Sequence, residues 1–163
     1  HAGGAEKHRQ IQPAGRRMKA PPEAAAAARL APREDHARRE IARIRNVCGD
    51  DLPIWSGNDD EAVAAMALGA QGVISVLSNL LPVQTQAMAK AALDGDFDTA
   101  AALQCHLLPL IEALFSEVNP IPVKAAMAAM GYCDDILRLP LTPMEEDHRQ
   151  NLLRLMRKAG LNV

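Results

Sequence analysis

The stretch from residue 52 to residue 76 constrains the fold most, because its pattern predicts a strand, a helix and a second strand. Leu52-Pro53-Ile54-Trp55 is short and apolar, and Gly72-Val73-Ile74-Ser75-Val76 is an almost continuous apolar run. Such runs are typical of parallel strands that are covered on both faces. Barrels and open α/β sheets built from such units form their sites at the carboxyl ends of the strands. We therefore expect an α/β fold with a ligand site where these two strands end.

A polar turn, residues 56–60, follows the first strand and leads into a helix expected over residues 60–68. The adjacent carboxylates Asp59 and Asp60 could serve acid–base chemistry or bind Mg²⁺. Their position before a helix favours capping and first-turn stabilisation instead. Gly69 ends the helix in the manner of a left-handed cap.

Charge divides the chain into two unlike parts. Residues 1–45 carry eleven Lys and Arg against five Asp and Glu, whereas the remainder carries seven against fifteen. Residues 1–36 are rich in Ala, Gly and Pro and hold few aliphatic side chains, so we expect a low-complexity segment that is disordered or belongs to another reading frame. Its basic residues have no interleaved aromatics, so we expect no nucleic-acid partner.

Cys48, Cys105 and Cys133 show neither CxxC spacing nor zinc-finger intervals, which favours reduced, partly buried thiols in a cytoplasmic protein. No apolar run approaches the roughly 18 residues of a membrane span. We expect a soluble chain with no membrane partner.

Helical spacing recurs through the rest of the chain. His106 sits within the apolar pattern of residues 97–118, and we interpret it as a core or edge histidine because no second metal ligand follows at i+4. Thr142 is a candidate N-cap for the last helix, with Glu145 in the capping-box position. The expected helices cover residues 40–48, 83–93, 97–118, 123–130 and 144–158.

Four motifs in order resemble the carboxyl-terminal part of the dihydrodipicolinate synthase family, within the superfamily of pyruvate-dependent aldolases and N-acetylneuraminate lyase. The resemblance covers about residues 41–161. The motifs are Ser56-Gly57-Asn58-Asp59-Asp60, Leu68-Gly69-Ala70-Gln71-Gly72-Val73-Ile74-Ser75-Val76, Asn119-Pro120-Ile121-Pro122-Val123-Lys124 and Leu137-Arg138-Leu139-Pro140-Leu141.

The resemblance implies a (β/α)8 TIM barrel with appended helices and, usually, a homotetramer. Residues 37–84 would form the last two β/α units of the barrel, and residues 85–163 the carboxyl-terminal helical domain. The family condenses pyruvate with aspartate semialdehyde on the way to diaminopimelate and lysine, through a Schiff base between pyruvate and a lysine. We expect no cofactor and no metal site.

The resemblance also assigns site residues. Backbone at Gly57 and Ile74 would line the pyruvate pocket. The Schiff-base lysine of the sixth strand should fall near residue 32, where this sequence has Pro32, and the relay tyrosine precedes the matched part. Lys124 follows two prolines and is interpreted as structural, and Tyr132 lies away from the strand ends. We therefore expect no catalytic residue in this chain and no activity by the chain alone.

Two alternatives stay open at this point. A sugar-acid aldolase such as N-acetylneuraminate lyase shares the superfamily. Those enzymes tend to place a polar group after the isoleucine that matches Ile74, where this chain has Ser75-Val76, and they resemble residues 119–124 less well. The chain could also be a non-enzymatic module that pairs through its helices, since the apolar stripe of residues 97–118 offers a face for a partner.

Overall fold

The computed structural model describes residues 34–49 and 51–163. Residues 34–163 form one compact unit. The expectations for residues 1–33, including the position of Pro32, lie outside the described residues. The division into barrel units and helical domain at residue 84 stays a prediction.

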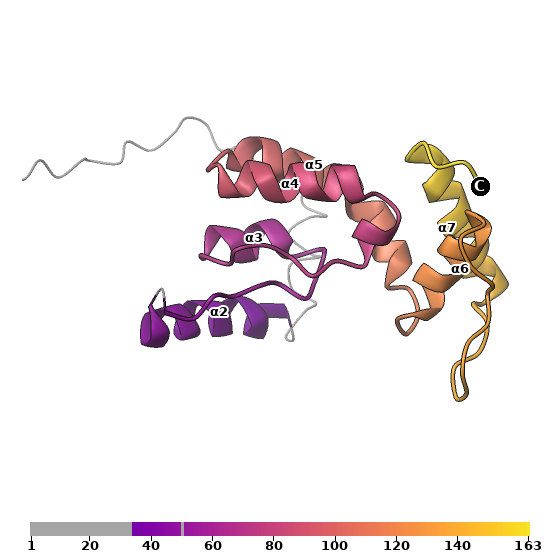
Figure 1. Ribbon diagram of the computed structural model, residues 1–163, viewed down its shortest axis with the longest axis horizontal. Helices are drawn as coiled ribbons and strands as arrows, with labels where there is room; N and C mark the ends of the chain where they lie inside the picture. Colours follow the sequence, from indigo (N-terminus) through magenta and orange to yellow (C-terminus); the bar gives the residue numbers. More distant parts are fainter. Residues whose placement is uncertain (1–33, 50) are drawn as a thin grey trace, which may run out of the picture. The chain divides into compact units, whose positions relative to one another are not determined.

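Helices dominate the described residues (Figure 1), in the order that the spacing predicted. The first helix begins at residue 34 rather than 40, because neither Gly nor Pro interrupts the sequence from there to Cys48. The elements are α2 (Glu34–Cys48), α3 (Ala62–Ala67), the 3-10 helix η1 (Leu77–Asn79), α4 (Pro82–Leu93), α5 (Phe97–Leu114), α6 (Ile121–Ala129) and α7 (Glu146–Lys158).

The two predicted strands are present only as extended segments. In the described part of the chain no residue is assigned to a strand, and the segments share one isolated parallel bridge, between Ser56 and Val73. Pro53 lacks a backbone donor, and two short parallel segments offer each other few hydrogen bonds. The expected order and parallel direction are confirmed, whereas the expected strand lengths are wrong.

The main apolar core joins η1, α5, α6 and α7. Side chains from all four elements are almost completely buried, among them Leu77, Ile111, Leu114, Leu152 and Met156. Most of the stripe predicted on residues 97–118 faces this core, although Phe115 remains 42% exposed. The core therefore fixes α5 as the central support of the helical layer.

A second, smaller cluster is built mainly from alanines. Ala65 of α3, Ala92 of α4 and Ala100 of α5 are all buried, together with Met66 and Ala70. Figure 1 shows α4 and α5 lying alongside one another, in agreement with their direct contact. Small side chains allow helices to approach closely.

Gly69 ends α3 with φ of +100°, as predicted. A Cβ atom at this position would lie 2.8 Å from Nε of Arg45, a flexible side chain that can shift, so the positive φ is what favours glycine. The chain then enters the second extended segment, where the Gln71 amide donates to the Ile54 carbonyl at 2.7 Å.

Helix capping uses a local side chain at α5 and a distant one at α7. Asp96 caps α5 by accepting a hydrogen bond from the Thr99 amide, and hydrogen bonds from Thr99 lower the pKa of Asp96. Thr142 does not cap α7, because that helix starts later and its N-cap is Glu145. The capping acceptor comes instead from Glu117, whose Oε1 accepts the Glu145 amide at 3.0 Å.

The predictions for cysteines are partly wrong. All three are free thiols, as expected, but Cys105 and Cys133 are exposed and only Cys48 is half-buried. Within residues 34–49 and 51–163, every helix is too short or too polar to cross a bilayer. The cytoplasmic location stays a prediction.

Replacing Leu152 by Ala should lower the free energy of unfolding by about 3 kcal/mol, because it opens a cavity in the main core. Leu139→Ala is the matched control, since that leucine is 90% exposed and should change stability by less than about 0.5 kcal/mol. Urea unfolding followed by circular dichroism measures both. Equal losses in the two variants would contradict the assigned core.

Replacing Glu117 by Ala should lower the free energy of unfolding by about 1 kcal/mol, because the Glu145 amide loses its acceptor. The same carboxylate also contacts Nδ1 of His148 at 2.8 Å. Glu112→Ala, on the exposed face of α5, is the control and should be close to neutral. The prediction fails if both variants unfold at the same urea concentration.

Candidate functional site

The carboxyl ends of the two extended segments lie side by side. The Ser56 amide donates to the Gly72 carbonyl at 2.9 Å, and the Ile74 amide donates to the Ser56 carbonyl at 2.8 Å. Gly57 follows Ser56 and Ile74 follows Val73, so both residues lie at the ends of one pair of hydrogen-bonded segments. The adjacency expected from parallel pairing is confirmed.

Both residues are accessible at this edge. Gly57 is exposed, and a Cβ atom built on it would meet nothing within 4 Å. The Ile74 side chain is 74% exposed. Among the described residues, neither the Gly57 amide nor the Ile74 carbonyl has a hydrogen-bond partner. The edge thus offers one backbone donor and one backbone acceptor to a polar ligand.

Asp59 lies next to this edge and is completely buried. Its Oδ2 accepts the Val76 amide at 2.8 Å and the Leu77 amide at 3.1 Å. The expectation that Asp59 caps the helix after it is wrong, because α3 has Glu61 as N-cap and no side-chain cap bond. Asp59 instead serves the start of η1, where unpaired amides favour an anion.

Gln104 of α5 holds the other side of the same turn. Its Nε2 donates to the Asp59 carbonyl at 2.7 Å, and its Oε1 accepts the Val63 amide at 3.3 Å. Sequence reasoning missed this residue, because a glutamine beside an apolar stripe gives no signal of a partner more than 40 residues away. The one available hint is the position of Gln104 next to Leu103, within the apolar pattern of residues 97–118.

The other candidates lie elsewhere. The lysines of the described residues are on helices: Lys90 on α4, paired with Asp94 at 2.6 Å, Lys124 on α6 and Lys158 on α7. Tyr132 is 68% exposed in the turn after α6. Asp60 is exposed, and in the part of the chain that the structure describes no group of His, Cys, Asp and Glu could hold a metal ion.

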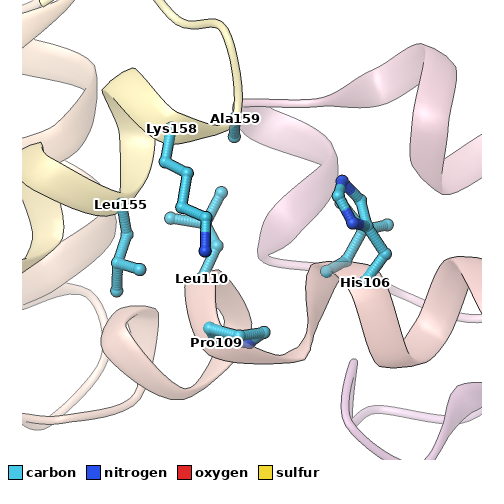
Figure 2. Close-up of a pocket in the computed structure, with 7 residues that line it drawn as sticks. His106, Pro109, Leu110, Leu155, Lys158 and Ala159 are labelled. Carbon is cyan, nitrogen blue, oxygen red and sulfur yellow. The ribbon is translucent and has the colours of Figure 1, made fainter.

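Hollows in the surface lie on both sides of α5. One, of about 330 Å³, adjoins the 56–60 turn and is lined by Asn58, Asp60, Ile111, Glu112 and Phe115. Another, of about 70 Å³, lies between α5 and α7. Figure 2 shows the side chain of Lys158 extending toward α5, and His106 standing on α5 itself. His106 is exposed, which agrees with the edge position and excludes the core position that the sequence also allowed.

Comparison with known proteins identifies relatives of this arrangement. The sequence model of the Dihydrodipicolinate synthetase family matches residues 34–159. The 4-hydroxy-tetrahydrodipicolinate synthase of Exiguobacterium sibiricum is 51% identical over 117 residues, covering 72% of this chain and 40% of the relative. The synthase of Alkaliphilus oremlandii is 44% identical over 122 residues, covering 75% of this chain and 42% of the relative.

Solved structures agree. The dihydrodipicolinate synthase of Aquifex aeolicus superposes with a TM-score of 0.75 at 39% identity, covering 76% of this chain and 42% of that one. This chain spans less than half the length of these relatives. Their names match the first interpretation of the motifs rather than the sugar-acid aldolase.

The family match covers most of the chain, includes the edge formed by Gly57 and Ile74, and is supported by both sequence and structure. The chain therefore belongs to the dihydrodipicolinate synthetase family and corresponds to the carboxyl-terminal part of its members.

Proposed function

We propose that this chain supplies the carboxyl-terminal part of a 4-hydroxy-tetrahydrodipicolinate synthase, which condenses pyruvate with aspartate semialdehyde. In this proposal residues 52–76 are the last two strands of a (β/α)8 barrel with the helix between them. The remaining helices form the appended layer. The observation that carries the proposal is the parallel bridge between Ser56 and Val73, which aligns two carboxyl ends at one exposed edge.

The backbone at this edge suits a small keto acid. Gly57 presents an amide with no side chain in front of it, and Ile74 presents a carbonyl beside an apolar side chain. Pyruvate combines a carboxylate, a ketone and a methyl group, so it needs a few polar partners and a small apolar contact. We therefore assign Gly57 and Ile74 to one wall of the pyruvate pocket.

The reactive amine belongs to the part of the fold that this chain does not match. Schiff-base formation needs a lysine whose pKa is lowered by its surroundings. The described lysines lie on α4, α6 and α7 rather than on the segments that end at the edge. The opposite wall, with its lysine, is the partner that completes the site. Assembly as a homotetramer is also part of the proposal, although one related solved structure is described as a monomeric variant.

Trapping with borohydride tests the assignment directly. Reduction of a pyruvate Schiff base adds a stable mass to the protein. We expect no adduct when the full chain is treated alone. We expect an adduct when the chain is co-produced with the unmatched amino-terminal portion of the Exiguobacterium sibiricum synthase, and on a lysine of that portion. An adduct on Lys124, or none in the co-produced pair, would refute the proposal.

Replacing Gly57 by Val should reduce pyruvate trapping in the co-produced pair at least about tenfold, because branched methyl groups would occupy the place of the ligand. A Cβ atom at this position would meet nothing within 4 Å, so the helical unit should keep its stability. Gln71→Val is the control: it is exposed and lies at the amino end of the second segment. Trapping rates that fall equally in both variants would argue against the assigned wall.

A further inference from the structure

We propose that Asp59 and Gln104 are positioning residues that set the geometry of the keto-acid wall and connect it to α5. Neither side chain needs to touch the substrate. Asp59 holds the two segment ends together, and Gln104 holds the Asp59 turn against α5. The inference rests on the proposed function, because it concerns the same wall.

Gly57 and Ile74, the wall residues, are enclosed on both sides by contacts between the two segments. The bridge between Ser56 and Val73 precedes Gly57 and Ile74 in their respective segments. After them, the Asp59 carboxylate binds the amides of residues 76 and 77. The two segments are thus joined before and after the wall residues, which leaves little freedom for the backbone between the joints.

The Asp59 carboxylate is the stronger of these two connections. It is completely shielded from solvent, and one of its oxygens accepts two backbone hydrogen bonds. Hydrogen bonds to a carboxylate are stronger than hydrogen bonds between neutral groups. Because this carboxylate is buried, water does not compete with the two amides for it. The joint at Asp59 is therefore stiffer than the single backbone bridge on the other side.

Gln104 connects the turn at Asp59 to α5. Gln104 donates to the Asp59 carbonyl and accepts from the Val63 amide, so one side chain spans the turn that follows the wall. α5 is anchored in turn by Leu107 and Ile111, both buried in the main core. A shift of α5 would consequently move the turn, and with it the Gly57 amide.

The test uses the full chain co-produced with the amino-terminal portion of the Exiguobacterium sibiricum synthase. Gln104→Met removes both hydrogen bonds at similar length, and Gln104→Glu removes the donor to Asp59 while keeping an acceptor for Val63. Each should raise the KM for pyruvate about tenfold, with a smaller change in kcat, because a displaced wall weakens binding. Leu152→Ala is the control for general loosening, because Leu152 lies on α7: it should lower Tm more than either variant and leave the KM within about twofold.

Two variants of Asp59 give a second readout. Asp59→Asn keeps an oxygen that can accept the two amides and should retain most of the pyruvate affinity, whereas Asp59→Ala should lose at least as much as Gln104→Met. Hydrogen exchange at residues 74–77 should accelerate in Asp59→Ala and Gln104→Met, and not in Leu152→Ala.

The outcomes separate the two proposals. If the unsubstituted pair does not trap pyruvate, the proposed function fails and the positioning role fails with it. If the unsubstituted pair traps pyruvate but the KM of Gln104→Met rises no more than that of Leu152→Ala, the positioning role alone is refuted. A rise in KM for both Gln104 variants, with the larger fall in Tm in Leu152→Ala, supports it.

Discussion

Two hydrogen bonds from backbone amides to the Asp59 carboxylate hold together the part of the structure on which the rest depends. The extended segments share a single bridge, and two short paired segments are marginal by themselves in water. The Asp59 carboxylate adds a second connection between the segments, to the amide of Val76, which lies 17 residues further along the sequence. Because this joint is buried, it constrains the edge without competition from solvent.

The helical layer matters because it gives this edge a firm support. A site formed by turns needs a scaffold that holds those turns in place. Here the scaffold is α5, whose apolar face is buried against η1, α6 and α7 and whose Gln104 reaches the turn. The same helix therefore contributes to the core and to the edge, so packing and site geometry are linked through one element.

Sequence reasoning succeeded where the controlling interactions are local. Periodic apolar residues gave the order of the helices. It failed where partners are distant in sequence. Thr142 was the predicted cap, but the acceptor at the start of α7 comes from Glu117. The sequence around Glu117 and Glu145 gives no sign of this hydrogen bond.

The candidate site follows the same division. Parallel pairing predicted that Gly57 and Ile74 would lie side by side, because carboxyl ends of parallel strands share an edge. The bridge between Ser56 and Val73 places them so. Their contact with pyruvate stays a prediction. The roles of Asp59 and Gln104 could not be inferred, since a buried acid and a half-buried amide acquire partners only once the chain has folded.

The alanine cluster between α3, α4 and α5 has a consequence for how this family can vary. A contact made of single methyl groups has almost nothing left to remove, so most substitutions there enlarge the side chain and push the helices apart. Change at these positions is consequently one-sided. We expect drift to accumulate on the outer faces of the three helices, while their shared seam stays restricted to the smallest residues.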